Sequence, residues 1–432
     1  MDYQQSRAYV SDADRYAGGA LDLTNIKELM KRLGNPQDQL KYVHVAGTNG
    51  KGSVIAYLYT TLSEAGYRVG RYISPSVYSY REKMEVAGRS VSREQFAGYV
   101  TRVAAAIEEM TSEGLAHPTP FEIETAVAFL FFAEENCDLV ILEVGMGGNL
   151  DATNIIKNTI LAVLVPISMD HQSFLGNTLS EIAEKKAGII KPGCSVVTAG
   201  QQPETMAVIK NVCAQNNADL TEADLREAKA VKEDFAGQIL EYRGETFELS
   251  LAGSYQTENA ALALEALHVL EKKGYPTTVL QRKKGLKDTR WNGRLTIIHR
   301  DPLFIVDGAH NPAAADMLED SVRKYFKGRK LFFIMGVFRD KDYPYIIRKL
   351  CPYAQQIVTV ETPDNPRALP AEELAEAIKP CNPNVQAAGS IEDAVNKVFD
   401  MAGCDDVILS FGSLSFIGQI TAIVKTREEK NS

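Results

Sequence analysis

The chain has 432 residues, of which 45% are hydrophobic and 24% charged, so it is long enough for two or three packed domains. Its formal net charge of −9 gives no general attraction to phosphate backbones, and we expect no nucleic-acid partner. Because there is no run of about eighteen apolar residues, and the first residues are neither basic nor apolar, we expect no membrane span and no signal peptide.

The six cysteines are scattered along the chain and contain no CxxC pair. In a chain of this size the pattern favours reduced, mostly buried thiols over a disulfide framework, and it predicts a cytoplasmic protein. Any anionic small-molecule substrate would have to be held by local positive charge.

The first two thirds of the chain alternate strand-like and helix-like stretches, which is the pattern of a sheet covered by helices. A short β-branched run at 42–46 predicts a strand, and the apolar stretch from Val54 to Leu62 predicts the helix that follows. Residues 121–133 are apolar nearly all round, as a buried helix would be.

A glycine-rich segment lies between the first predicted strand and helix. Glycines at 47, 50 and 52 allow backbone conformations with positive φ and bring N–H groups close to phosphate oxygens. Lys51 adds a positive charge, and Ser53 places a hydroxyl at the start of a helix whose dipole favours anions. A glycine separates Lys51 from Ser53, so the common GxxxxGK[ST] pattern is not met. The segment predicts nucleotide binding, with a plain strand–helix turn as the alternative.

Two continuous apolar runs, 139–142 and 160–165, predict further strands with polar groups at their carboxyl ends. Glu143 follows the first run, and Asp170 and His171 follow the second. Open α/β sheets build their ligand sites just beyond the carboxyl ends of their strands.

The chain changes character after residue 226. Residues 226–252 look like antiparallel hairpins, with a turn at 242–245. The composition turns basic at 282–290, where we place the boundary between a domain of residues 1–290 and one of residues 291–432. Beyond it the alternation of strands and helices restarts, with strands predicted at 303–306, 331–335, 356–360 and 407–410. The basic stretch 282–294 fits either a contact with a polyanionic substrate or a solvated linker.

Six segments, taken in order, resemble the Mur ligase superfamily and, within it, the folylpolyglutamate synthase and dihydrofolate synthase family. They are residues 44–53 (HVAGTNGKGS), 143–154 (EVGMGGNLDATN), 170–176 (DHQSFLG), 182–193 (IAEKKAGIIKPG), 307–312 (DGAHNP) and 362–369 (TPDNPRAL). The resemblance covers nearly the whole chain.

This resemblance implies an α/β fold class. It consists of a P-loop-type N-terminal ATPase domain, with a mainly parallel sheet plus a small antiparallel sheet, and a smaller Rossmann-like α/β C-terminal domain. It implies an ATP-dependent ligase that activates a carboxylate as an acyl phosphate, which the amine of L-glutamate then attacks. The acceptor it implies is a folate, with dihydropteroate as a second acceptor, and we expect the enzyme to be a monomer.

The resemblance also implies roles for single residues. The expected ATP contacts are Gly47, Thr48, Asn49, Gly50, Lys51, Gly52, Ser53, Asn259, Arg294, Asp307 and His310. The expected metal site for Mg²⁺ consists of Ser74, Glu143 and His171, with Lys186 carbamylated to offer oxygen to a second metal. Lys51, His171 and Lys186 are the expected catalytic residues, and Asp151 and Thr153 are expected to shape the acceptor site.

Some of these residues also have plainer interpretations. Mg²⁺ prefers oxygen ligands, so Glu143 is the first choice and His171 on its own would be structural. Lys185 could be confused with Lys186 as the modified lysine. Asn311 and Pro312 fit the N-cap and first residue of a helix, which is compatible with a nucleotide site beside them.

At three positions the chain departs from the family pattern. Ser76 replaces a histidine, Tyr255 stands where a histidine is frequent, and Asn149 stands where a basic residue is common. These departures leave ATP-driven ligation intact but bear on the choice of a pterin substrate.

Two other functions compete with the folate ligase. A peptidoglycan-type Mur ligase carries a further N-terminal domain, for which the 46 residues before Gly47 are too few. A non-catalytic nucleotide-binding regulator would have lost its metal and lysine positions, whereas Glu143, His171 and Lys186 are all present.

Overall fold

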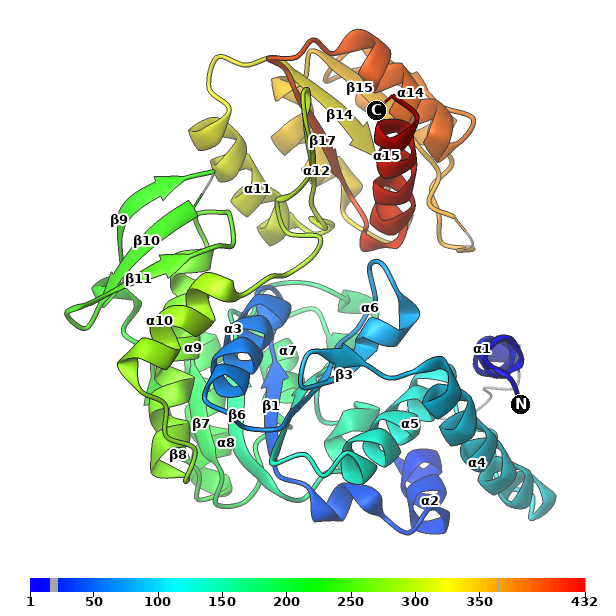
Figure 1. Cartoon of the computed structure of the whole chain (residues 1–432), viewed down its shortest axis with the longest axis vertical. Helices are drawn as coiled ribbons and strands as arrows, with labels where there is room; N and C mark the ends of the chain where they lie inside the picture. Colours follow the sequence, from blue (N-terminus) through cyan, green and yellow to red (C-terminus); the bar gives the residue numbers. More distant parts are fainter. Residues whose placement is uncertain (16–21, 236, 364, 432) are drawn as a thin grey trace. The chain divides into compact units, whose positions relative to one another are not determined.

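The computed structural model describes residues 1–15, 22–235, 237–363 and 365–431 (Figure 1). Contacts divide the chain into two compact units. The first comprises Met1–Ser76, Tyr80–Ala228 and Glu258–Asp288, and the second Val77–Ser79, Lys229–Thr257 and Thr289–Ser432. The boundary that we predict at residue 290 stays a prediction, while contacts group residues 229–257 with the second unit. Asp364, in the sixth family-like segment, lies outside the described residues.

An eight-stranded sheet forms the centre of the first unit, in the order β4-β3-β2-β5-β1-β6-β7-β8. Its pairs are parallel except those of β3 with β2 and with β4. The strands are β1 Tyr42–Ala46, β2 Val69–Tyr72, β3 Met84–Val86, β4 Arg89–Ser90, β5 Leu139–Glu143, β6 Thr159–Leu164, β7 Ser195–Thr198 and β8 Asp219–Glu222.

The three strands predicted from the sequence, β1, β5 and β6, are confirmed and are adjacent in the sheet. Because they are parallel, their carboxyl ends meet at one edge. The segments after residues 46, 143 and 164 therefore come together, although they are far apart in the sequence.

The helices of the first unit cover this sheet. They are α1 Tyr3–Asp12, α2 Thr24–Arg32, α3 Lys51–Glu64, α4 Arg93–Ser112, α5 Pro120–Glu134, α6 Gln172–Leu175, α7 Leu179–Ala187, α8 Pro203–Gln215, α9 Gln256–Lys272 and α10 Val279–Asp288, with α9 beginning at the end of a second-unit segment. Short 3-10 helices, labelled η, occur at Ala13–Arg15, Pro36–Gln39, Tyr80–Lys83, Ala152–Ile155 (η4) and Leu225–Glu227, and in the second unit at Cys351–Tyr353 and Leu414–Phe416.

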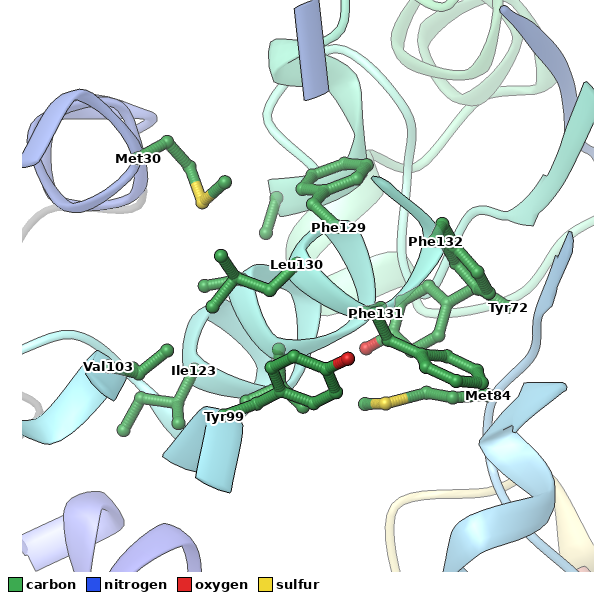
Figure 2. Close-up of a cluster of buried hydrophobic side chains, with 14 of the residues drawn as sticks. Met30, Tyr72, Met84, Tyr99, Val103, Ile123, Phe129, Leu130, Phe131 and Phe132 are labelled. Carbon is green, nitrogen blue, oxygen red and sulfur yellow. The ribbon is translucent and has the colours of Figure 1, made fainter. Parts of the chain in front are cut away.

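The predicted buried helix is α5. Its N-cap is Thr119, whose side chain accepts from the backbone of Glu122 in a capping box, and Pro120 occupies the first helical position. Residues 129–132 are all at most 2% exposed. Figure 2 shows why: Leu130 points toward Met30 of α2, whereas Phe131 lies against Met84 of β3. The helix is apolar all round because other elements cover it on several sides.

Residues 282–288 of the basic stretch 282–294, for which a solvated linker is one interpretation, lie in the helix α10, Val279–Asp288. It packs closely on α3, since a Cβ on Gly285 would lie 2.3 Å from Oγ1 of Thr61. Arg282 donates to Glu271 at 2.8 Å and Lys284 pairs with Glu64 at 2.5 Å. The solvated-linker interpretation is therefore wrong for residues 282–288, because they lie in a helix and the charges of Arg282 and Lys284 pair with neighbouring carboxylates.

The second unit contains two sheets. The three-stranded antiparallel sheet, in the order β11-β10-β9, consists of β9 Lys229–Asp234, β10 Gly237–Tyr242 and β11 Glu245–Leu249. Arg243 and Gly244 both have positive φ, as a two-residue hairpin turn requires. This confirms the predicted hairpins and their turn.

The other sheet has the order β12-β13-β17-β14-β15-β16 and is parallel apart from β12. Its strands are β12 Thr296–Arg300, β13 Leu303–Val306, β14 Leu331–Met335, β15 Gln356–Thr359, β16 Val385–Ala387 and β17 Val407–Phe411. Its helices are α11 Pro312–Tyr325, α12 Tyr343–Leu350, α13 Ala371–Ile378, α14 Ile391–Met401 and α15 Ile417–Asn431. Phe332 and Phe333 belong to different core clusters, so helices cover both faces. All four strands predicted here are confirmed.

All six cysteines are free, four of them buried, which agrees with the expected reduced thiols. Among the described residues no helix combines the length and the apolar character that crossing a membrane requires.

Candidate active site

The glycine-rich loop connects β1 to α3, as predicted. Gly47 has φ 138°, and a Cβ there would lie 2.2 Å from Cγ2 of Val165. Gly50, the residue before α3, has φ 98°, and a Cβ there would lie 2.5 Å from Oδ1 of Asn259. Both positions therefore need glycine for two reasons, the backbone conformation and the close neighbour. The contact also places Asn259 beside the loop.

Thr48 ties the loop to the segment that follows β6. Its backbone N–H donates to the carbonyl of Pro166 at 2.9 Å, and its hydroxyl donates to the carbonyl of Ser168 and accepts from the Ser168 N–H, both at 3.0 Å. Asn49 and Gly52 are half-buried, and Ser53 is buried in the first turn of α3. The loop is thus held in shape at the positive end of a helix dipole, an arrangement that binds anions.

Two lysines converge on one carbonyl oxygen of this loop. Nζ of Lys51 lies 3.3 Å and Nζ of Lys186 2.8 Å from the oxygen of Gly47. Lys186 is only 5% exposed, and its burial lowers the pKa of its amine to about 7. The charge of Lys51 is a second, smaller cause of this lowered pKa, while Asp170 and Asp151 oppose the shift.

Lys186 is positioned by the short helix α7. The helix starts with a capping box in which the Thr178 side chain accepts from the backbone of Glu181, and Lys186 lies in its last turn. Asn149 N–H donates to the carbonyl of Lys185 at 2.8 Å, and a Cβ on Gly148 would lie 2.8 Å from the carbonyl oxygen of Lys186. The family-like segments 143–154 and 182–193 therefore lie against each other.

The predicted metal residues are brought together only in part. Glu143 ends β5 opposite Val45 of β1, is 7% exposed, and accepts from the backbone N–H of Ser74 at 3.2 Å. Among the described residues no group of three His, Cys, Asp or Glu side chains could hold a metal ion. A buried carboxylate beside a phosphate loop still fits Mg²⁺, since this ion takes one or two protein oxygens and completes its shell with phosphate and water.

His171 is the N-cap residue just before α6, has φ 50° and lies beside Asp170. Its backbone N–H donates to Oδ1 of Asp170 at 2.8 Å, and its Nε2 lies 3.9 Å from Oδ2. Asp170 was not among the predicted site residues, although it follows the same strand as His171. Its charge raises the pKa of Lys186, against the effect of burial, so this carboxylate lies near the lysine.

Asp151 and Thr153, predicted to shape the acceptor site, are both buried. Asp151 accepts from Met146 N–H at 2.8 Å and from the Thr153 hydroxyl at 2.5 Å. Burial raises the pKa of Asp151, and hydrogen bonds from Thr153, Met146 and Gly145 oppose that shift. The Thr153 hydroxyl also contacts Nε2 of His44 at 2.8 Å. His44 was not predicted either; its one signal in the sequence is a polar residue inside an apolar strand.

In the second unit the predicted residues Asp307 and His310 follow β13, and the predicted Arg294, which precedes β12, lies beside this segment. Asp307 accepts from the N–H groups of Leu295 at 2.9 Å and Ala309 at 2.8 Å. Burial raises the pKa of Asp307, and the charge of Arg294 opposes the shift. Nδ1 of His310 lies 2.7 Å from the carbonyl oxygen of Gly308 and must carry the proton, since a carbonyl only accepts.

The same segment leads into α11. Asn311 is the N-cap, its side chain accepting from Ala314 N–H, and Pro312 is the first helical residue, so the predicted helix start is confirmed. A Cβ on Gly308 would lie 2.3 Å from Nη1 of Arg294, which shows how closely the guanidinium covers this turn.

Three residues, Ser76, Tyr255 and Asn149, depart from the family pattern, and the contacts of two of them explain how they pack. The ring of Tyr255 packs on Gly253, where a Cβ would lie 2.8 Å from it, and the backbone of Asn149 binds the end of α7. Ser76 is half-buried at the end of a first-unit segment.

Comparison with known proteins identifies the family. Residues 45–267 match the Mur ligase middle domain, and residues 293–414 match the Mur ligase, glutamate ligase domain. The dihydrofolate synthase/folylpolyglutamate synthase of Bacillus subtilis is 34% identical over 98% of this chain and 99% of its own length.

Solved structures agree with these matches. A Mycobacterium tuberculosis folylpolyglutamate synthase complexed with ADP superimposes with a TM-score of 0.88 at 30% identity, covering 98% of this chain and 99% of that one. E. coli FolC in complex with DHPP and ADP gives a TM-score of 0.85 at 27% identity, covering 99% of this chain and 98% of that one.

The fold and the sequence matches define a Mur ligase, an ATP-dependent acid–amino-acid ligase. Within that superfamily the chain belongs to the folylpolyglutamate synthase/dihydrofolate synthase family, as the resemblance implies.

Proposed function

We propose that this ligase adds L-glutamate to a tetrahydrofolate, and that it also joins glutamate to dihydropteroate to make dihydrofolate. The names of the relatives support both reactions, since the Bacillus subtilis relative carries both activities in its name. The observation that supports ATP-driven chemistry most directly is the pair of lysines, Lys51 and Lys186, at the Gly47 carbonyl of the phosphate loop.

ATP would bind with its phosphates on the loop. The residues that we assign to it are Gly47, Thr48, Asn49, Gly50, Lys51, Gly52, Ser53 and Asn259, together with Arg294, Asp307 and His310 of the second unit. Lys51 holds its ammonium against the loop carbonyls, from which it can swing to a phosphate oxygen. Neutralising the phosphates and positioning the carboxylate are the main requirements of phosphoryl transfer.

Mg²⁺ would be held by Glu143, with the Ser74 hydroxyl and His171 beside it, and would neutralise phosphate charge when bound. The acceptor carboxylate attacks the γ-phosphorus of ATP, forming an acyl phosphate and releasing ADP. The glutamate amine then attacks the acyl carbon, the carbon–oxygen bond to phosphate breaks, and inorganic phosphate leaves with loss of a proton from nitrogen.

A phosphate-release assay tests this function. The full chain receives Mg²⁺-ATP and glutamate with tetrahydrofolate, dihydropteroate or a UDP-muramyl peptide substrate in turn. Release is expected with each of the first two and to depend on glutamate. Release with the muramyl substrate alone would overturn the folate assignment, and no release with any would favour a regulator.

Substitution of Glu143 tests the metal assignment. Glu143→Gln keeps the shape but removes the charge, and we expect kcat to fall by about 100-fold or more. Glu134→Gln, at an exposed position of α5, is the matched control and should leave kcat unchanged. Equal activity of the two variants would contradict the assignment.

We further propose that Lys186 carries a carbamate. Burial beside Lys51 disfavours the ammonium form, and a carbamate would replace the repulsion between two cations by attraction. The neutral amine attacks the carbon of CO₂, an N–C bond forms, one C=O becomes a carboxylate C–O⁻, and a proton leaves nitrogen for water.

Carbon-13 NMR with labelled bicarbonate tests this modification. We expect a carbamate signal in the wild type and in Lys185→Ala, and none in Lys186→Ala. A signal that survives in Lys186→Ala, or its absence from the wild type, would refute the carbamate.

The small-molecule substrates, the free thiols and the absence of a strongly basic charge support a cytoplasmic enzyme with no nucleic-acid or membrane partner. We propose that it acts as a monomer, which sedimentation velocity would test: a dimer at assay concentration would contradict it.

A further inference from the structure

Three buried polar side chains form a hydrogen-bonded network that links β1 to the 3-10 helix η4 of the first unit. Nε2 of His44, on β1, lies 2.8 Å from Oγ1 of Thr153, and this hydroxyl lies 2.5 Å from Oδ1 of Asp151. His44 and Thr153 are both 0% exposed and Asp151 is 6% exposed. All three side chains therefore lie inside the protein, where a polar group without a hydrogen-bond partner is energetically unfavourable.

The direction of each hydrogen bond follows from the number of protons. Asp151 accepts from backbone N–H groups and from Thr153, so its carboxylate acts as an acceptor only. Thr153 has one hydroxyl proton, which it donates to Asp151, and its oxygen must accept from His44. The proton of the neutral imidazole consequently sits on Nε2. Nδ1 of His44 has no hydrogen-bond partner among the described residues.

Asp151, at the end of this network opposite His44, holds the loop of residues 144–151 in place. Asp151 accepts from Met146 N–H at 2.8 Å, and so closes this loop on itself. On one side a Cβ on Gly145 would lie 2.8 Å from the ring of Phe121, and on the other Gly148 packs on the carbonyls of α7. The loop begins after Glu143 and ends against the helix that carries Lys186.

Keeping His44 buried is unfavourable in itself. An apolar residue on β1 would avoid both the loss of hydration and the unpaired Nδ1, and each of these disfavours the folded state. A polar residue in the centre of a parallel sheet needs a reason beyond packing. Within the described part of the protein, the hydrogen bond that the His44 side chain makes leads to Thr153 and, through it, to Asp151.

We infer that His44 and Thr153 are positioning residues of the ligase, which hold the Asp151 carboxylate and the 144–151 loop in the geometry that the acceptor requires. Neither touches the reacting atoms. Their effect on the acceptor rests on the proposed function, whereas their effect on the loop does not.

Kinetics of hydroxyl variants test the inference. Thr153→Val keeps the size and removes the hydroxyl; we expect kcat/KM for the folate acceptor to fall about tenfold or more, with KM for ATP within about threefold. Thr153→Ser should restore most of the activity. An unchanged kcat/KM in folded Thr153→Val, or a loss that Thr153→Ser does not restore, would overturn the inference.

A double-mutant cycle separates a connected chain from two independent packing defects. His44→Leu and Thr153→Val break the same chain, so the double variant should be no worse than the poorer single variant. Losses that multiply would mean that the two residues act separately, which contradicts the inference.

Hydrogen exchange gives a readout that needs no activity. Thr153→Val should speed amide exchange in residues 145–153 and leave α15 unchanged, because only the loop loses its anchor. If the wild type proves inactive on folates but exchange responds in this way, the proposed function fails and the network stands. Unchanged exchange in the loop would refute the network itself. Nitrogen-15 NMR of His44 should show the Nε2–H tautomer, and the other tautomer would contradict the chain of hydrogen bonds.

Discussion

At the scale of single residues, the site depends on groups whose surroundings differ sharply from water. Lys186 and Lys51 share one carbonyl oxygen, and burial together with their mutual repulsion disfavours two ammonium groups. Gly47 and Gly50 of the phosphate loop are equally constrained, because a neighbouring side chain or backbone occupies the space that a Cβ would need.

The first prediction concerns Gly50. Gly50→Ala must strain the backbone at φ 98° and displace Asn259, so we expect at least a tenfold loss of ATP affinity, measured by calorimetric titration. Gly66→Ala is the matched control: Gly66 has φ 91° with nothing within 4 Å, so it should cost about 1 to 2 kcal/mol of stability and leave ATP affinity intact. Equal ATP affinity in both variants would contradict the steric argument.

The second prediction concerns acid stability. Burial lowers the pKa of His44 to about 3, so the unfolded chain gains a proton near pH 6.5 that the folded chain refuses until about pH 3. The contribution of neutral His44 to the free energy of unfolding is therefore fully present above about pH 6.5 and is lost as the pH falls from there toward pH 3. The loss between pH 7 and pH 5 is about 2 kcal/mol. In urea unfolding, the free energy of unfolding of His44→Gln should fall by about 2 kcal/mol less between pH 7 and pH 5 than that of the wild type. The same fall in both proteins would contradict the prediction.

At the scale of elements, the parallel strands β5, β1 and β6 bring three loops to one edge of the sheet, and the short helix α7 closes the site from the side. A helix of nine residues has only marginal stability in isolation, so both its N-terminal cap and its packing are needed to keep α7 folded.

The third prediction tests the cap of α7. Thr178→Ala removes the capping box of α7, and Ser92→Ala removes the one of α4. Each should cost about 1 kcal/mol in thermal unfolding. Only Thr178→Ala should also lower kcat, by about threefold or more, because α7 carries Lys186 whereas α4 carries no proposed site residue. Equal kcat values in the two variants would mean that α7 needs no cap to position Lys186.

At the scale of the whole molecule, two compact units each have their own core. Phe129 belongs to a core cluster of the first unit and Phe333 to one of the second, and both are 0% exposed. Separate cores allow the units to unfold as separate cooperative blocks.

The fourth prediction follows from this division. Scanning calorimetry should resolve two unfolding transitions. Phe129→Ala should lower the midpoint temperature of one and Phe333→Ala that of the other, because each substitution removes about 3–5 kcal/mol of unfolding free energy from its unit. A non-hydrolysable ATP analogue should raise the transition that Phe129→Ala lowers, because the phosphate loop lies in the first unit. A single transition that both variants lower equally would contradict two independent cores.

Strands, helices and the phosphate loop were predictable because their signals are local. Apolar runs predicted β1, β5 and β6, and glycine spacing predicted the loop between β1 and α3. The short strands β2, β3 and β4 carry too few residues for a clear pattern. The sequence leaves a linker at 282–294 open, because Glu271 and Glu64, the partners of Arg282 and Lys284, come from other helices.

The sequence by itself determined the family, the ATP-dependent ligase class and the principal candidate residues, because six ordered segments carry that information in residue identity alone. Only the tertiary structure decided how those residues meet. Lys186 reaches Gly47 across 139 residues, and His44 reaches Thr153 across 109. Such contacts exist because parallel strands bring distant carboxyl ends to one edge of a sheet, and burial there changes the protonation of side chains whose identity the sequence shows but whose surroundings it does not.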